Sequence, residues 1–167
     1  MADFVRGGVL KPKVYLETSV ISYLAGRVSR DVVTVANQQV TRTWWRDGRS
    51  DFELYVSRVV LLEIGAGDLS VARSRLDLVR EIPRLDLTQE CFLLAEELLQ
   101  GLALPRVTAG RDALHIAVAA MNGVDFLLTW NCRHIANAVL IPRIASIIER
   151  RGYRAPVLCT PPQLMGR

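Results

Sequence analysis

Short apolar runs alternate with longer amphipathic stretches along most of the chain. Each short run is bounded by polar residues, glycine or proline, a pattern typical of buried β-strands. Such runs predict strands at residues 13–16, 53–56, 84–87, 124–128 and 157–159. Strands that alternate with helices favour a parallel sheet covered on both faces, because each crossover lays a helix against the sheet.

Amphipathic stretches predict helices between these runs. The clearest follows Thr88, where apolar residues recur at the helical spacing i, i+3, i+4, i+7 and i+8. Those residues are Cys91, Leu94, Ala95, Leu98 and Leu99. Further helices are expected at residues 18–25, 31–46, 58–64, 69–80 and 108–123, and from Asn131 onward, where Pro142 kinks or restarts the helix.

Two details of the early helices can be predicted from the sequence. Thr18 or Ser19 is expected to cap the first helix, because a hydroxyl oxygen accepts a hydrogen bond from an unpaired backbone N–H there. The second helix is expected to place Val33, Ala36, Val40 and Thr43 or Trp44 on one face.

The length of 167 residues suits one domain, and half of the residues are hydrophobic, which is enough for a sizeable core. No internal repeat or linker interrupts the pattern. We expect residues 1–12 to form an N-terminal lead-in and residues 13–167 to form one domain.

Charge and cysteine content narrow the class of protein. The formal net charge of +4 permits binding to a polyanion without demanding it, because the basic residues are spread along the chain. Cys91, Cys132 and Cys159 are far apart, which favours neither a zinc site nor a disulfide framework. No apolar run approaches the ~20 residues of a membrane span, and no signal peptide is evident. These features predict a soluble, cytoplasmic protein that does not enter a membrane.

Four polar residues stand out: two follow predicted strands, one lies in the helix after the second strand, and one lies near the first turn of the helix at residues 108–123. They are Glu17, Glu63, Asp112 and Asn131. In open parallel sheets, ligands gather beyond the carboxyl ends of the strands, so these side chains are expected to converge there. Carboxylates that lie close together repel unless a cation lies among them, and oxygen ligands suit Mg²⁺ or Mn²⁺. Such an ion can activate water for cleavage of a phosphodiester.

Four segments resemble the motifs of PIN domains, and they occur in the order of that family. VYLETSVISYL at residues 14–24 is similar to the opening signature, and SRVVLLE at residues 57–63 has the spacing of the second acid. DALHIA at residues 112–117 resembles the helix of the third acid. LLTWN at residues 127–131, with HIAN at residues 134–137, resembles the fourth site of a VapC-like subfamily.

This resemblance implies a three-layer α/β/α fold with a central parallel sheet. It also implies a metal-dependent endoribonuclease of the kind found as the toxin of type II toxin–antitoxin pairs. Carried over by motif, the catalytic residues and ligands of Mg²⁺ or Mn²⁺ are Glu17, Glu63, Asp112 and Asn131. The implied partners are an RNA substrate, a cognate antitoxin protein and a second copy of the chain in a homodimer.

Other residues are expected to support this site. Thr18, Ser19 and His115 would lie behind the ligands and orient a carboxylate or a bound water. Alternatively, His115 is a hydrogen-bonded structural histidine, which is the more common role.

Three residues are candidates for contact with the substrate. Arg111, Arg133 and His134 would contact RNA phosphates. For His134, the simpler interpretation is an exposed histidine on the surface of a helix. Asn131 has a simpler role too, because asparagine is a favoured N-cap residue.

Two departures from the PIN pattern support a second hypothesis. Glu17 stands where PIN domains usually have Asp, and Asn131 brings no charge to the fourth position. The alternative is therefore a catalytically degraded PIN-like module that binds RNA or a partner protein without cleavage. A flavodoxin-like phosphate binder is disfavoured, because no glycine-rich loop follows the first strand.

Overall fold

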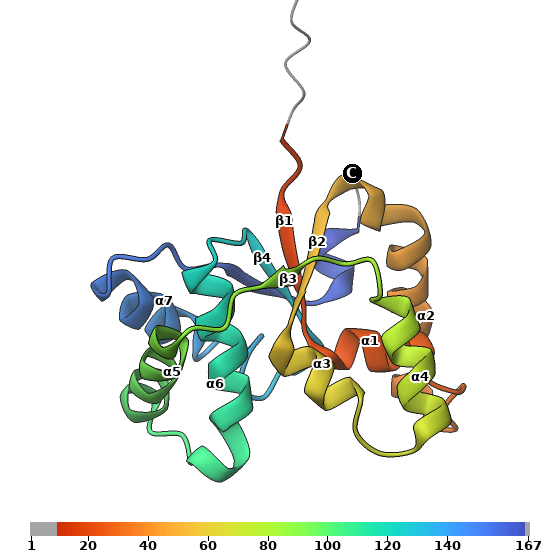
Figure 1. Ribbon diagram of the computed structural model, residues 1–167, viewed down its shortest axis with the longest axis horizontal. Helices are drawn as coiled ribbons and strands as arrows, with labels where there is room; N and C mark the ends of the chain where they lie inside the picture. The colour runs from red at the N-terminus through yellow and green to blue at the C-terminus, as the bar shows by residue number, and fades with distance from the viewer. Residues whose placement is uncertain (1–9, 166–167) are drawn as a thin grey trace, which may run out of the picture.

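Five parallel strands form the centre of the computed structural model, which describes residues 10–165 (Figure 1). Their order across the sheet is β3-β2-β1-β4-β5. The strands are β1 (Lys13–Leu16), β2 (Glu53–Ser57), β3 (Arg84–Leu85), β4 (Phe126–Leu128) and β5 (Val157–Cys159). Most of the predicted lead-in, residues 1–9, lies outside the described residues.

The central strand is buried on both faces. Val14, Tyr15 and Leu16 are fully buried, and Tyr15 pairs with Tyr55 on one side and Leu127 on the other. Both faces are covered because parallel strands are joined by helical crossovers. The apolar run at the start of the domain is therefore a core strand.

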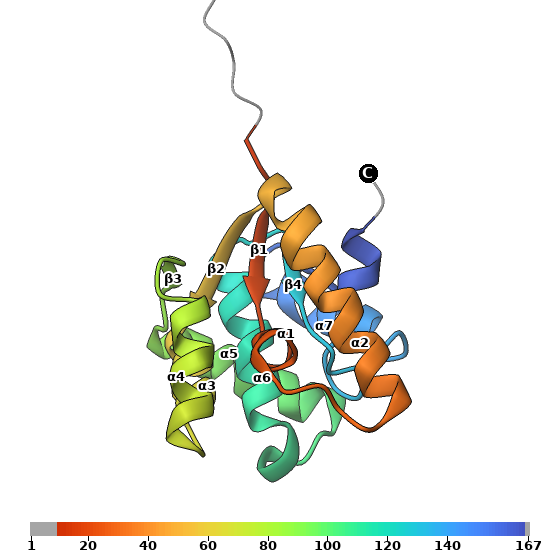
Figure 2. The same cartoon turned by 90° about the vertical axis from the view of Figure 1, so that its right-hand side faces the viewer.

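Two groups of helices cover the two faces of the sheet, as Figure 1 and its rotated view in Figure 2 show. On one side lie α1 (Thr18–Ala25), α2 (Val32–Thr43), α3 (Arg58–Ile64) and α4 (Leu69–Leu78). On the other lie α5 (Gln89–Leu102), α6 (Arg106–Met121) and α7 (Ile141–Arg150). The predicted three-layer α/β/α architecture is confirmed.

The direction of chain progression across the sheet reverses between β1 and β4. The chain passes from β1 outward to β2 and β3, then returns through α5 and α6 to β4 on the other side of β1. A crevice opens at such a reversal beyond the carboxyl ends of the two strands. Glu17 follows β1, and Thr129 to Asn131 follow β4, so both segments reach this position.

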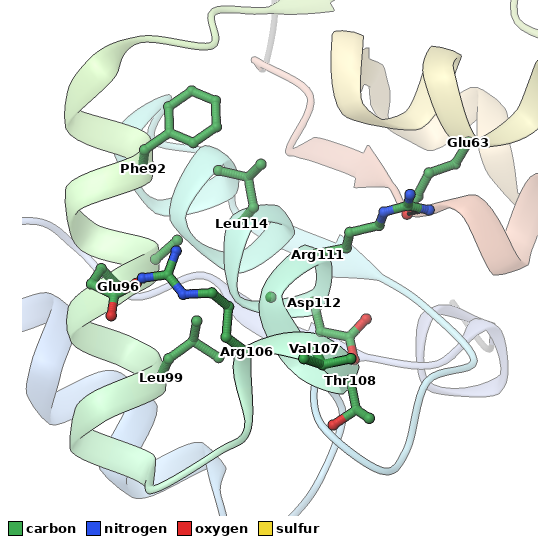
Figure 3. Close-up of a pocket in the computed structure, with 12 residues that line it drawn as sticks. Glu63, Phe92, Glu96, Leu99, Arg106, Val107, Thr108, Arg111, Asp112 and Leu114 are labelled. Atoms are coloured by element: carbon green, nitrogen blue, oxygen red, sulfur yellow. Dashed lines mark hydrogen bonds and ion pairs between the residues drawn. The ribbon is translucent and has the colours of Figure 1, made fainter.

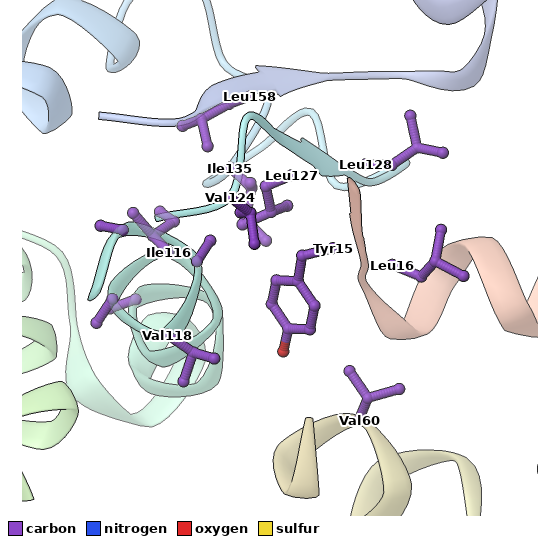
Figure 4. Close-up of a cluster of buried hydrophobic side chains, with 14 of the residues drawn as sticks. Tyr15, Leu16, Val60, Ile116, Val118, Val124, Leu127, Leu128, Ile135 and Leu158 are labelled. Atoms are coloured by element: carbon purple, nitrogen blue, oxygen red, sulfur yellow. The ribbon is translucent and has the colours of Figure 1, made fainter. Parts of the chain in front are cut away.

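The predicted core helix is confirmed, and its apolar stripe is buried along its whole length. All five residues of the stripe after Thr88 are at most 6% exposed. Figure 4 shows the core from within, with Ile116 and Val118 of α6 facing the side chains of the sheet.

The second helix differs from its predicted form. Val33 is 67% exposed and Ala36 is exposed, whereas Gln38 and Thr41 are buried. The predicted apolar face was therefore wrong at Val33 and Ala36, whereas Trp44 at its far end is fully buried. After Thr43 the helix continues as a π-helical turn, Trp44–Gly48.

The polar residues buried in α2 have specific hydrogen-bond partners. Gln38 bonds the backbone of Arg27 and Ser29, and Thr41 accepts a hydrogen bond from the Trp130 indole. Because burial of a satisfied polar group costs little, these contacts override the apolar pattern.

The helix predicted from Asn131 onward does not form. Residues 131–140 are turns, and α7 begins at Ile141 with Pro142 in its first turn. Pro142 has no backbone N–H and a fixed φ, which suits a helix start. Proline therefore starts a helix here.

Smaller differences concern element ends. α6 begins at Arg106 instead of Thr108, and the strands predicted at residues 84–87 and 124–128 are shorter. The cap of α1 is neither Thr18 nor Ser19, because the side chain of Glu17 accepts from the Ser19 backbone N–H. Within residues 10–165, no helix combines the length and apolar character needed to cross a membrane.

Candidate metal centre

Glu17 lies where β1 ends and α1 begins, and it is 6% exposed. Its Oε2 accepts hydrogen bonds from the Ser19 backbone N–H at 3.1 Å and from Thr129 Oγ1 at 2.7 Å. The Ser19 hydroxyl also donates to this oxygen. The carboxylate is therefore held through one oxygen, while none of the hydrogen bonds within residues 10–165 uses Oε1.

Glu63 lies in the last turn of α3 and is held in the same way. Its Oε2 lies 2.9 Å from His115 Nε2 and accepts from the Thr18 hydroxyl. Its Oε1 lies 3.6 Å from a guanidinium nitrogen of Arg111. Burial alone raises the pKa of the Glu63 carboxyl, but the His115 and Thr18 hydrogen bonds and the Arg111 charge hold that pKa below its ordinary value.

These two carboxylates come together although their residues are far apart in sequence. One ligand atom each of Glu17, Glu63 and His115 lies within 4.8 Å of the others. Like charges at this separation repel, and a cation between them removes that cost. Two carboxylate oxygens with little other engagement suit a hard cation such as Mg²⁺ or Mn²⁺. The donor set therefore fits the metal that the sequence implied.

Asp112 lies in the second turn of α6, where it pairs with a histidine from the turns after β4. Its Oδ2 is 2.7 Å from His134 Nδ1. His134 is 9% exposed and lies in a turn, so its interpretation as an exposed helical histidine was wrong. Asp112 is outside the cluster of Glu17, Glu63 and His115. Like the two glutamates, it accepts its hydrogen bond through a single oxygen.

Asn131 organises the turn that carries His134. Its Oδ1 accepts from the backbone N–H groups of Arg133 at 3.2 Å and of His134 at 3.0 Å. This is a capping contact, and it uses both lone pairs of the carbonyl oxygen. Arg133 itself is exposed at the surface.

A pocket of about 590 Å³ adjoins the acids between α5 and α6 (Figure 3). Glu63 and Asp112 line one end, and Phe92 lies at the other. Figure 3 shows the Arg111 side chain extending toward Glu63, and this side chain is 78% exposed. The pocket therefore offers an apolar wall, a positive charge and carboxylates in one continuous surface.

Sequence reasoning gave three polar residues of this region no part in the site. They are Tyr15, Ser57 and Thr129. All three are fully buried. A signal existed for Tyr15, because a buried tyrosine hydroxyl needs a hydrogen-bond partner. The sequence alone does not show which distant residue supplies it.

Comparison with known proteins adds one finding. No protein-family model matches the sequence, and no curated protein matches it. Among solved structures, the chain is similar to a chain of VapBC2 from Rickettsia felis, crystallised with a DNA fragment from the promoter. The TM-score is 0.51 at 16% identity, over 89% of this chain and 98% of that one. The likeness supports the PIN-like fold and, at this identity, shows the fold alone.

Proposed function

We propose that this protein is a metal-dependent endoribonuclease and the toxin of a toxin–antitoxin pair. The observation that carries the proposal is the pair Glu17 and Glu63, two anchored carboxylates from different elements at the reversal point of the sheet. Structural proteins have little use for buried like charges this close, because the repulsion costs stability.

Each acid has a distinct part in holding Mg²⁺ or Mn²⁺. Glu17 and Glu63 offer the oxygens that their hydrogen bonds leave available, and Asp112 offers its second oxygen. A bound ion would activate water and neutralise phosphate charge. Asn131 acts by capping the turn that positions His134 against Asp112.

The RNA strand is proposed to pass along the pocket between α5 and α6. Arg111 is exposed beside the acids and is suited to contact a phosphate, with Arg133 as a second cation nearby in the fold. Phe92, 47% exposed at the far end of the pocket, offers a face on which a base can stack.

The antitoxin proposal rests on the similar structure, which is VapBC2 bound to a DNA fragment from its promoter. By analogy, we propose an antitoxin partner for this chain. The homodimeric state and the cytoplasmic location are proposed from the resemblance of the sequence motifs to PIN-domain toxins. Co-expression with the neighbouring open reading frame, followed by sizing of the purified complex, tests the antitoxin partner and the homodimeric state.

The decisive experiment is cleavage of a mixed RNA pool by the purified protein with Mn²⁺ and with EDTA. Glu63→Gln and Asp112→Asn should reduce the cleavage rate at least ~100-fold, because each removes a charge from the metal site. The matched control is Glu53→Gln, which neutralises an exposed glutamate at the opposite end of β2 and should cleave normally.

Two results favour different functions. Cleavage that survives EDTA or both site variants would reject the metal nuclease. Absence of cleavage, together with weak Mn²⁺ binding and retained RNA binding, would favour the degraded PIN-like module. The neutral, capping Asn131 is the observation behind that alternative.

A further inference from the structure

The hydroxyl of Tyr15 lies at the centre of a buried chain of hydrogen bonds. It is 2.6 Å from Ser57 Oγ and 2.8 Å from His115 Nδ1. The other nitrogen of His115, Nε2, is the one that lies 2.9 Å from Glu63 Oε2. Figure 4 shows the Tyr15 ring pointing from its strand toward the region between α6 and the helix of Val60.

The positions of the protons in this series of hydrogen bonds follow from the one at Glu63. An ionised carboxylate only accepts hydrogen bonds, so His115 Nε2 must carry the proton between them. In a neutral imidazole the other nitrogen, Nδ1, then has a lone pair and accepts from the Tyr15 hydroxyl. Tyr15 in turn accepts from Ser57.

One further observation agrees with this direction. Ser57 Oγ also receives the backbone N–H of Val60 at 3.4 Å, which caps α3. The reverse direction would place a lone pair of Nε2 against a carboxylate oxygen, which is repulsive.

We propose that Tyr15 is a positioning residue that, together with Glu63, fixes His115 in the Nε2–H tautomer. His115 then acts as a hydrogen-bond donor that orients Glu63, and it is not itself a metal ligand. The inference rests on the proposed metal site and deepens it. It assigns His115 Nε2, which lies 2.9 Å from Glu63 Oε2, to proton donation and leaves the carboxylate oxygens to the ion.

The first test reads the tautomer directly, by long-range ¹H–¹⁵N correlation NMR of the two histidines. Wild type should show His115 protonated at Nε2 alone, with and without Mg²⁺. Tyr15→Phe removes the donor to Nδ1 and leaves Glu63 as the remaining partner that favours Nε2–H, so a measurable fraction of the Nδ1–H tautomer should appear. An Nδ1–H or doubly protonated ring in wild type, or loss of the Nε2 proton on Mg²⁺ addition, would overturn the inference.

The second test measures the consequence for metal affinity. Tyr15→Phe should weaken Mn²⁺ binding about 10-fold, the usual cost of losing a group that orients a ligand. Tyr55→Phe is the matched control, since it removes a hydroxyl from the adjacent strand whose hydrogen bond within residues 10–165 is to Glu53, and it should bind Mn²⁺ as wild type does. Circular dichroism checks that both variants fold.

A histidine series separates positioning from ligation. His115→Gln keeps an N–H donor and should retain more Mn²⁺ affinity than His115→Leu, which keeps none. Equal affinity of Tyr15→Phe and wild type would reject the inference and leave the nuclease intact. An Nε2–H tautomer in a protein that binds no Mn²⁺ would instead reject the proposed function.

Discussion

Each acid of the candidate site is held by side chains from other elements through one of its two oxygens. Thr129 holds Glu17, His115 holds Glu63, and His134 holds Asp112. This arrangement limits rotation of the carboxylates before a ligand arrives, which reduces the entropy lost on binding. Mutation of the holding residues should therefore affect function almost as much as mutation of the acids.

His134 offers a direct test of this idea at a single residue. His134→Leu removes the 2.7 Å contact to Asp112 and should weaken Mn²⁺ binding about 10-fold, with a matching loss of cleavage at low Mn²⁺. Titration calorimetry and cleavage rates across Mn²⁺ concentrations measure both effects. Cys132→Ser, an exposed substitution in the same turn, should change neither. Unaltered Mn²⁺ affinity in His134→Leu would remove Asp112 from the site.

The sequence indicated the acids and three of the residues that hydrogen-bond them, Thr18, Ser19 and His115, but not the contacts of Thr129, His134 and Tyr15. Glu17 and Glu63 could be expected to meet because parallel strands and the helices after them share one edge of the sheet. The contact between Tyr15 and His115 joins residues 100 positions apart, and nothing local in an apolar strand indicates it. Such contacts follow from packing, which the hydrophobic pattern does not specify.

At the scale of elements, prediction succeeded where the buried side chains are apolar. The stripe of α5 and the continuous apolar run of β1 can each be buried in only one way. The apolar face predicted for α2 was wrong because the buried residues there are polar and form hydrogen bonds with Arg27, Ser29 and Trp130. The helix predicted from Asn131 onward was wrong because Asn131 caps a turn, and no helix follows that turn directly.

Asp125 ties two strands together just before β4 begins. Its Oδ2 accepts from the Lys13 backbone N–H at 2.8 Å, and its Oδ1 pairs with Arg154 at 2.7 Å. The Arg154 hydrogen bond first, and then the Lys13 N–H, hold the pKa of this carboxyl below its ordinary value. Asp125→Asn should therefore lower the free energy of unfolding at pH 7 by about 1 kcal/mol.

The difference in the free energy of unfolding between wild type and Asp125→Asn should depend on pH with a definite sign. A carboxyl whose pKa is lowered by folding stabilises the protein above its unfolded pKa of about 3.9, and this contribution disappears as the pH falls through the folded value. Urea unfolding of wild type and Asp125→Asn should thus converge in acid. The control is Asp77→Asn, whose exposed pair with Arg80 should matter by less than ~0.5 kcal/mol. A difference that grows toward low pH would contradict this account.

At the scale of the whole molecule, the fold places Glu63, Asp112 and the exposed Arg111 on one surface beside the pocket between α5 and α6. The reversal of strand order locates the acids, and the pocket between α5 and α6 extends from them toward Phe92. The net charge of +4 is modest, so RNA binding should depend on a few well-placed cations more than on the overall field. Arg111 is the cation at the junction of acids and pocket.

Arg111 can contact a phosphate of the substrate or pair with Glu63. The salt dependence of RNA affinity distinguishes these two roles. If it contacts a phosphate, Arg111→Gln should make the slope of log affinity against log salt shallower by about 0.7, the value for one contact to a single strand. The measurement is binding of a single-stranded RNA oligonucleotide in EDTA, which prevents metal-dependent cleavage. Arg80→Gln, near the end of α4 in the opposite helical layer, should leave the slope unchanged.

The contrary result would be equally specific. An unchanged slope would mean that Arg111 makes no phosphate contact when RNA binds. Its 3.6 Å approach to Glu63 would then be its main interaction, and Arg111→Gln should tighten Mn²⁺ binding, because a positive charge no longer competes with the metal ion. Measuring both affinities on one variant therefore decides whether this exposed arginine belongs to the substrate track or to the electrostatics of the metal site.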